Sequence, residues 1–222
     1  MPRAKPLAFA QLFRLPNLFT AVADPLAGWL IAGGNQGGQL ALVVGASACL
    51  YTAGMVFNDC FDYRADCQAR PERPLPRGAI PVPVAWWVGG ILFLAGLACG
   101  GGKALPLAAL IVFYNVFAKH FAALGPVTLG ACRACNFALG LGGFVPLWPP
   151  LLLGIYVAGL SFVARREEVR PELRRWVKRL LLGIIAVDAG LVLTLTGDWL
   201  GAAMVLGLLV PAIGLGRWIP MT

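Results

Sequence analysis

Residues 58–78, NDCFDYRADCQARPERPLPRG, place three aspartates and four arginines within 21 positions. They interrupt a chain of 222 residues that is 59% hydrophobic and 13% charged, with a mean hydropathy of +0.78. A soluble domain carries about 25% charged residues. The composition therefore indicates a membrane protein, and the stretch indicates a charged site at the membrane surface.

Apolar runs on both sides of this stretch predict an all-α membrane bundle. A helix needs about 20 mostly apolar residues to cross the hydrocarbon core of a bilayer. Eight runs predict eight transmembrane helices, at 12–32, 39–57, 82–100, 104–118, 122–145, 148–164, 175–196 and 198–217. Because no long linker or low-complexity tract separates them, we expect a single domain over residues 1–222.

The basic residues predict the orientation of the bundle. Lys and Arg concentrate on the cytoplasmic side of membrane helices. With the N-terminus in the cytoplasm, 16 of the 18 basic residues fall on that side, while Lys103 lies outside and Arg133 lies within a helix. We expect a multi-pass protein of the cytoplasmic membrane with residues 58–78 facing the cytoplasm. The same loops explain the net charge of +8 without a nucleic-acid partner.

The aspartates have the spacing of a helical face. Asn58, Asp62 and Asp66 are four apart, and Asp59 and Asp62 are three apart, so we expect them on one face of the second helix as it continues into the cytoplasm. Clustered carboxylates suit Mg²⁺, whose coordination substrate phosphates complete. Arginine forks bond phosphate oxygens in pairs. The stretch is predicted to hold Mg²⁺ and a lipid diphosphate; the alternative is a solvated helix end with local Asp–Arg pairs.

Three segments of the chain resemble one family. The sequence NDCFDYRADCQARPERPLPRGAI (58–80) closely resembles the first aspartate-rich motif of the UbiA superfamily of intramembrane prenyltransferases. RLPNLFTAVADPLAGWL (14–30) is similar to the family's first helix, and YNVFAKH (114–120) to a Tyr-x-x-x-x-Lys segment after its fourth. The resemblance implies a bundle around a central cavity that opens sideways to lipid. It also implies Mg²⁺-dependent transfer of a prenyl group from its diphosphate to an acceptor.

The resemblance also implies roles for individual residues. Asp59, Asp62 and Asp66 are expected to bind Mg²⁺, and Asp59 and Asp62 to act in catalysis. The expected partners are a prenyl diphosphate, a small-molecule or lipid acceptor, and membrane lipid. The candidate substrate-binding residues are Asn58, Arg73, Arg77, Tyr114, Lys119, Arg133, Asn136 and Ser161.

A second aspartate-rich motif, usual near the sixth helix of the family, is replaced here by YVAGLSFVARREE (156–168). We expect Arg165 to act in catalysis in place of a second metal, because an arginine stabilises charge on a leaving phosphate. Glu167 would ligate the remaining metal or orient Arg165. The alternative is that Arg165 is an ordinary basic anchor. The SFVARREE form of this segment and the segment GACRACNFALG (130–140) both resemble the divergent EboC-like branch of the UbiA superfamily.

The family normally has nine helices and eight runs are found, so we expect either that the ninth helix is absent or that the given sequence ends before it. Three ionisable residues, Asp24, Arg133 and Asp188, lie at similar depth in the predicted bundle, where an unpaired charge is costly. They are predicted to form a network near Asn136. This network is either a polar floor of the cavity that contacts the acceptor or a structural staple between helices.

Two other functions fit parts of the sequence. Because the second motif is missing, the protein is alternatively a non-catalytic binder of a lipid diphosphate or prenylated metabolite, acting in transport or as a partner subunit. Diphosphate release that depends on Mg²⁺ discriminates the enzyme from the binder. A phosphatidyl-type alcohol transferase would need interleaved glycine and Ala-Arg between its aspartates, which residues 58–66 lack.

Overall fold

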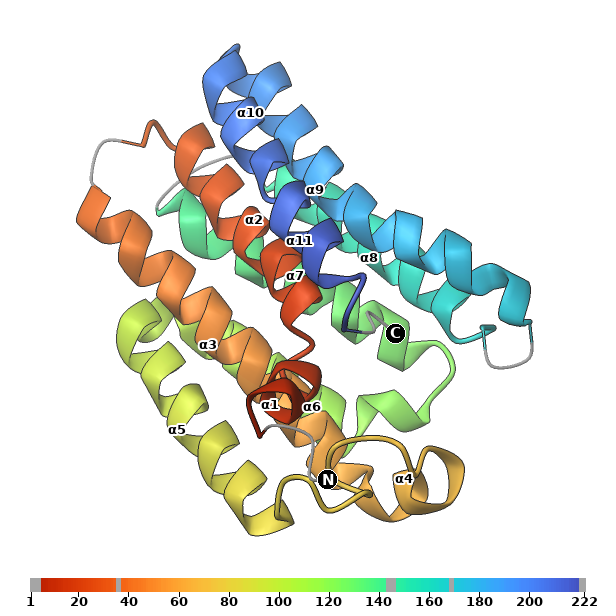
Figure 1. Ribbon diagram of the computed structural model, residues 1–222. Coiled ribbons are helices and arrows are strands. Elements are labelled where there is room, and N and C mark those ends of the chain that lie inside the picture. The colour runs from red at the N-terminus through yellow and green to blue at the C-terminus, as the bar shows by residue number, and fades with distance from the viewer. Residues whose placement is uncertain (1–4, 35–36, 143–146, 168–169, 220–222) are drawn as a thin grey trace.

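The computed structural model describes residues 5–34, 37–142, 147–167 and 170–219, and the regular elements in these ranges are all helices (Figure 1). The all-α prediction is therefore confirmed. The α-helices are α1 (Lys5–Leu12), α2 (Leu15–Ile31), α3 (Gly37–Phe61), α4 (Tyr63–Ala69), α5 (Val82–Gly100), α6 (Leu105–Val116), α7 (Leu124–Leu141), α8 (Trp148–Ala164), α9 (Arg174–Thr196), α10 (Trp199–Gly207) and α11 (Leu209–Leu215). Three short 3₁₀ helices are η1 (Gly101–Ala104), η2 (Ala118–His120) and η3 (Pro171–Leu173).

Three helical stretches among the described residues have the length and hydropathy needed to cross a membrane, at Gly38–Phe61, Val82–Val116 and Arg174–Thr196. Two shorter apolar helices cover Trp148–Ala164 and Trp199–Leu215. The stretch Val82–Val116 covers the two predicted runs 82–100 and 104–118, whereas each of the other helices coincides with one predicted run. The number of eight spans and the cytoplasmic position of the N-terminus stay predictions.

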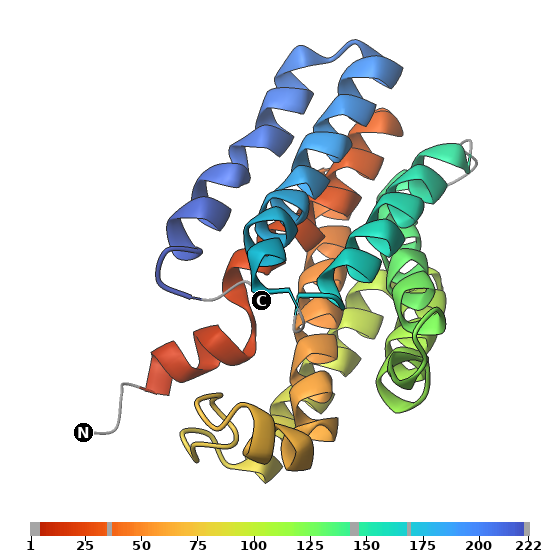
Figure 2. The ribbon, with the colours of Figure 1, turned by 90° about the vertical axis from the view of Figure 1, so that its right-hand side faces the viewer.

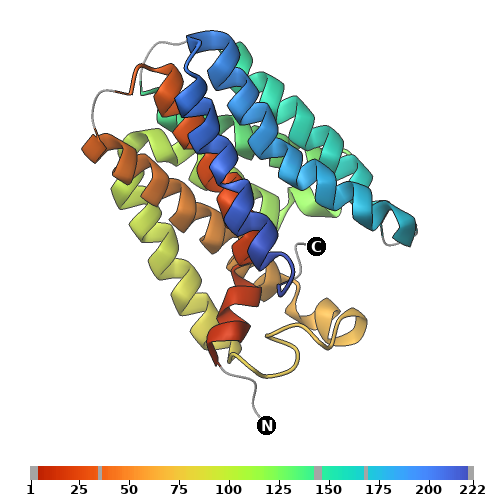
Figure 3. The same ribbon diagram turned by 45° about the horizontal axis from the view of Figure 1, so that its top comes forward.

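Helix α2 lies in the middle of the bundle, where it contacts α3, α7, α9 and α11 (Figure 1). The largest apolar core forms around it, from buried residues of α2, α7, α8, α9, α10 and α11. Helix α5 lies on the outer flank, packed along α3 (Figure 1). Helices α9 and α10 form an antiparallel pair (Figure 2). The α10–α11 segment runs along α2 (Figure 3).

Glycines set the distance between α2 and α7. A Cβ atom added at Gly140 would collide with the carbonyl oxygen of Pro25, and one added at Gly28 would collide with the carbonyl oxygen of Phe137. Small residues allow membrane helices to approach this closely. Because α2 and α7 carry the buried polar residues described below, this contact also places those residues opposite one another.

The structure breaks the helices at three places inside the predicted segments. Arg14 separates α1 from α2 with a left-handed backbone (φ 46°, ψ 52°). The run at 198–217 is divided at Leu208 into α10 and α11. The third break corrects a prediction: α3 ends at Phe61 and α4 begins at Tyr63, so the helix is interrupted at Asp62. Asp59 and Asp66 therefore do not lie on one continuous helix.

The charged stretch, α1 and α4 lie at the same end of the bundle (Figures 1 and 2). A small apolar cluster holds them together, with Leu12, Leu75 and Ile80 buried against residues of α3 and α5. This cluster gives the loop after α4 a fixed position. Arg73, which this loop carries, thereby reaches Asp59 at the end of α3.

Candidate functional site

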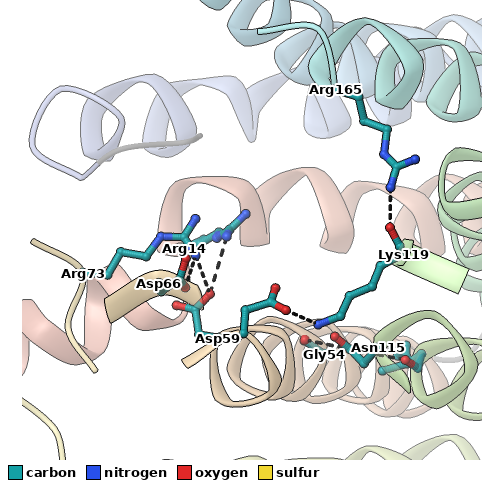
Figure 4. A network of polar contacts seen from close by, with 10 residues as sticks. Arg14, Gly54, Asp59, Asp66, Arg73, Asn115, Lys119 and Arg165 are labelled. Atoms are coloured by element: carbon teal, nitrogen blue, oxygen red, sulfur yellow. Dashed lines mark hydrogen bonds and ion pairs between the residues drawn. The ribbon is translucent and has the colours of Figure 1, made fainter. Parts of the chain in front are cut away.

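Asp59 and Asp66 converge on one arginine. The Nη1 atom of Arg73 lies 3.4 Å from Oδ1 of Asp59 and donates a 2.7 Å hydrogen bond to Oδ2 of Asp66 (Figure 4). The two carboxylate side chains are only 7% and 8% exposed. The break at Asp62 makes this convergence geometrically feasible, because α4 turns Asp66 back toward the end of α3. Two nearly buried carboxylates thus share one cation.

Arg14, which the sequence indicates only as one of the basic residues on the cytoplasmic side, is a second cation on the same carboxylate. Its Nη2 atom lies 3.6 Å from Oδ1 of Asp59 (Figure 4). Its left-handed backbone is costly for a residue other than glycine and persists where surrounding contacts hold it. In the sequence this residue is marked only as the first of the segment RLPNLFTAVADPLAGWL (14–30).

Asp62 faces a different cation. Its Oδ1 atom lies 2.5 Å from Nζ of Lys119, which also stands 5.6 Å from the centre of the Phe61 ring. Lys119 is on η2, far from Asp62 in the sequence. The structure therefore joins the first aspartate-rich segment to the YNVFAKH segment. It also separates the three aspartates into a pair on Arg73 and one on Lys119.

Other predicted residues lie around this centre. Tyr114 is half-buried and within electrostatic range of Arg14, Asp62 and Arg165. Its neighbour Asn115, which the sequence analysis missed, donates to the carbonyls of Ile111 (3.0 Å) and Gly54 (3.4 Å) and ties α6 to α3. Asn58 is half-buried directly before Asp59, and Ser161 is buried near the end of α8.

Arg77 and Glu167 are engaged elsewhere. The Nη2 atom of Arg77 donates to Oε1 of Gln11 (2.8 Å), which fastens the loop to α1. Glu167 accepts a 3.0 Å hydrogen bond from Nε of Arg174. The structure thus pairs Glu167 with a cation of α9 and not with Arg165 or the aspartates. Its predicted role as a metal ligand gains no contact in this structure and stays a prediction.

Arg165 reaches from the end of α8 to the connection between α6 and α7. It donates to the carbonyl oxygens of Phe121 (2.6 Å) and Lys119 (Figure 4). No acidic partner of Arg165 is found among the described residues. Its predicted action on a leaving phosphate therefore stays a prediction.

A second polar network lies deep between α2 and α7. Arg133 Nη1 lies 3.2 and 3.0 Å from the two carboxylate oxygens of Asp24 and donates to the carbonyl of Thr20 at 2.8 Å. Asn136 donates to Asp24 and to the carbonyl of Ala21, both at 2.7 Å. The predicted pairing of Asp24 with Arg133 is confirmed. These hydrogen bonds occupy donors of Arg133 and Asn136. They directly support the interpretation of the network as a structural link between helices. The predicted contact of Arg133 and Asn136 with substrate gains no support from the structure.

Asp188 of α9 completes the deep network. It is fully buried and close enough to Asp24 and Arg133 for their charges to interact. No N–H or O–H group of the described residues donates to either of its carboxyl oxygens. The predicted grouping of Asp24, Arg133 and Asp188 is therefore found, with Arg133 held by Asp24.

The surface site can be compared with the ligands that a divalent cation needs. The described residues contain no group of three or more His, Cys, Asp or Glu side chains placed to hold a metal ion. Yet Asp59 and Asp66 already bring their oxygens around a single positively charged nitrogen of Arg73. Mg²⁺ is usually held by one or two carboxylates together with substrate phosphates and waters. Asp59 and Asp66 are the residues that could hold it.

An all-helical bundle with apolar helices of bilayer length defines an integral membrane protein. A model of the UbiA prenyltransferase family matches residues 18–166. The chain belongs to the UbiA prenyltransferase family.

Curated relatives of the chain share one description. The digeranylgeranylglyceryl phosphate synthase of Thermococcus gammatolerans is 36% identical over 196 residues, which cover 78% of this chain and 67% of the relative. The chain spans 58% of the length of two further synthases of this kind that it matches. The predicted place in the EboC-like branch stays a prediction.

Solved structures share the fold. A structure described as giving insights into the biosynthesis of digeranylgeranylglyceryl phosphate synthase in membranes aligns with a TM-score of 0.65 at 19% identity, over 95% of each chain. A UbiA homologue from Archaeoglobus fulgidus, bound to DMAPP and Mg²⁺, aligns with a TM-score of 0.63 at 14% identity, over 94% of this chain and 85% of the homologue. The UbiA-like fold predicted from the sequence is therefore confirmed.

Proposed function

We propose that this protein transfers a prenyl group from a prenyl diphosphate to an acceptor within the membrane, in a reaction that depends on Mg²⁺. One observation carries the proposal: Asp59 and Asp66 converge on a single cationic nitrogen, with Arg14 and Lys119 beside them. Membership of the prenyltransferase family supports it. The bound DMAPP and Mg²⁺ of the Archaeoglobus homologue support the choice of substrate and metal.

In the proposed reaction, the diphosphate head group is bound by the charged side chains that form ion pairs with one another in this structure. Asp59 and Asp66 would hold Mg²⁺, which when bound neutralises charge on the diphosphate and makes it a better leaving group. Arg73, Arg14 and Lys119 would then turn their donors from carboxylates to phosphate oxygens. Arginine suits this exchange because its planar fork matches carboxylate and phosphate equally.

Transfer breaks the bond between C1 of the prenyl chain and the diphosphate oxygen. The electron pair of that bond leaves with the diphosphate, and the allylic cation stays in the apolar interior. The acceptor supplies the electron pair of the new bond and loses a proton, which the released diphosphate accepts. Water would capture the cation, so exclusion of water by the bundle is part of the reaction.

The relatives guide the first choice of acceptor. They are named for a product with two geranylgeranyl groups on a glyceryl phosphate. We therefore propose a lipid acceptor that carries a phosphorylated glycerol, presented at the cytoplasmic face of the cell membrane.

The test is release of diphosphate by the protein purified in detergent. Prenyl diphosphates of several lengths are incubated with Mg²⁺, with geranylgeranylglyceryl phosphate or with lipid extract as acceptor. We expect release that is abolished by EDTA and by Asp59→Ala, together with a prenylated product identified by mass. Binding of the same diphosphates without release would contradict the proposal and favour the non-catalytic binder.

A further inference from the structure

The end of α8 is linked to the diphosphate site through the backbone of η2. We propose that Arg165 is a positioning residue, which acts on the head-group site through Lys119 and not by touching the phosphate. The effect on diphosphate binding rests on the proposed function above, whereas the structural part of the proposal does not. This assignment differs from the predicted role of Arg165 as a replacement for a second metal.

The contacts of Arg165 are with carbonyl oxygens. One terminal nitrogen donates to the carbonyl of Phe121 at 2.6 Å, and the other donates to the carbonyl of Lys119. Both ends of the guanidinium fork are therefore engaged with one short segment of backbone. A guanidinium that clamped a phosphate would need the same fork for two phosphate oxygens.

The last carbonyls of the segment need donors from outside it. A 3₁₀ helix leaves its last carbonyls without partners within the helix. Phe121 O also accepts a 3.2 Å hydrogen bond from the backbone N–H of Gly125, whereas Arg165 supplies the donor for Lys119 O. The rings of Phe117 and Phe121 pack in a tilted arrangement with their centres 4.8 Å apart. Arg165 thus satisfies the end of η2 from a different helix.

Space for this contact is provided at the start of α7. A Cβ atom added at Gly125 would lie 3.4 Å from the Nη2 atom of Arg165 and 3.3 Å from the carbonyl oxygen of Ala118. The guanidinium therefore packs directly over the first turn of α7. The same position joins three segments: the end of α8, η2 and the start of α7.

The position of η2 decides where Lys119 can reach. Its Nζ atom lies 2.5 Å from Oδ1 of Asp62, and the side chain is only 9% exposed. Lysine is a flexible point charge, so its direction depends on the backbone that carries it. When Arg165 fixes that backbone, it fixes the approach of the Lys119 ammonium to the head-group site.

A double-mutant cycle separates positioning from direct contact. Affinity for Mg²⁺ with inorganic diphosphate is measured by calorimetry in Arg165→Ala, Lys119→Ala and the double variant. We expect Arg165→Ala to weaken binding about tenfold in the native background and to have almost no further effect when Lys119 is already alanine. Equal weakening in both backgrounds would show that Arg165 acts on the phosphate directly and would overturn the proposal.

Hydrogen exchange provides a readout that needs no ligand. Amide exchange over residues 117–125 is expected to rise in Arg165→Ala and to stay native in Lys119→Ala. Arg165→Lys, which keeps the charge but loses the fork, is expected to recover the protection only partly. Arg166→Ala is the matched control, because Arg166 is exposed and adjacent. Native exchange in Arg165→Ala would overturn the proposal.

The two readouts also separate this proposal from the proposed function. If the native protein fails to bind Mg²⁺ and diphosphate, the prenyl-transfer proposal fails. The exchange measurement then decides alone whether Arg165 holds η2.

Discussion

Arg73 is the cation that two nearly buried carboxylates share. Removing one partner of a buried ion pair leaves uncompensated charge. We expect Arg73→Ala to lower the free energy of unfolding by about 1–3 kcal/mol in the absence of Mg²⁺. Because Mg²⁺ can take the place of the lost guanidinium, added Mg²⁺ should raise the unfolding temperature of this variant more than that of the native protein.

The matched control for this measurement is Arg64→Ala, which removes an exposed arginine of α4. Its unfolding temperature and its response to Mg²⁺ should stay native. An equal gain from Mg²⁺ in Arg73→Ala and in the native protein would contradict the interpretation that Asp59 and Asp66 form a metal site.

The deep pair of Asp24 and Arg133 predicts a larger effect on stability. Asp24 is fully buried and accepts hydrogen bonds from Arg133 and Asn136. Asp24→Asn leaves the arginine without its counter-ion, so we expect a loss of about 3–5 kcal/mol in unfolding free energy, measured by chemical denaturation in mixed micelles. Thr194→Val, which removes a hydroxyl bonded within its own helix, should cost far less. Similar losses of unfolding free energy in both variants would contradict the interpretation that the network holds α2 and α7 together.

At the scale of elements, α2 and α7 form the contact on which the deep network depends. Gly140 leaves no room for a Cβ atom beside the carbonyl of Pro25. We expect Gly140→Val to separate the two helices and to lower the yield of folded, monodisperse protein in size-exclusion chromatography. Gly90→Ala adds its Cβ where no atom lies within 4 Å, so it should behave as native protein. A native yield of folded, monodisperse protein from Gly140→Val would contradict the close contact between α2 and α7.

The helices could be predicted from the sequence because an apolar segment in a membrane must satisfy its backbone hydrogen bonds within a helix, and helices are found at the predicted apolar runs. The breaks at Arg14 and Asp62 do not follow from the apolar runs, because both residues pair with distant segments of the chain. Arg14 leaves the helical conformation where its side chain meets Asp59. The interruption at Asp62 accompanies the pairing of Asp62 with Lys119. Spacing alone places Asp59 and Asp66 on one helix, whereas the structure brings them together by bending the chain.

The sequence predicts which residues form the site more fully than it predicts which of them contact one another. The first motif identified Asp59, Asp62 and Asp66, and the family resemblance added Lys119. The partner of Glu167 was not predictable, because the basic cluster around it offers several equivalent cations. The partners of Arg165 were not predictable either, because they are backbone carbonyl oxygens. Only the fold places Arg174 beside Glu167 and the carbonyl of Lys119 beside Arg165.

At the scale of the whole molecule, the charge distribution predicts one orientation. Cys67 is an exposed free cysteine of α4, and Lys103 lies in η1 at the opposite end of α5. A membrane-impermeant thiol reagent should label Cys67 in inside-out vesicles and not in intact cells. Lys103→Cys, made in a Cys67→Ser background, should show the reverse. Labelling of Cys67 in intact cells would contradict the cytoplasmic position of the site.

Diphosphate release by Asp66→Asn, compared with Asp198→Asn, tests the central claim most directly. Asp198 caps α10 at the opposite end of the bundle, where it accepts a 3.0 Å hydrogen bond from the backbone of Gly201 (Figure 1). We predict that Asp66→Asn loses Mg²⁺-dependent release by about 100-fold, while Asp198→Asn releases diphosphate at a near-native rate. Native release from Asp66→Asn would contradict the assignment of the head-group site to Asp59 and Asp66.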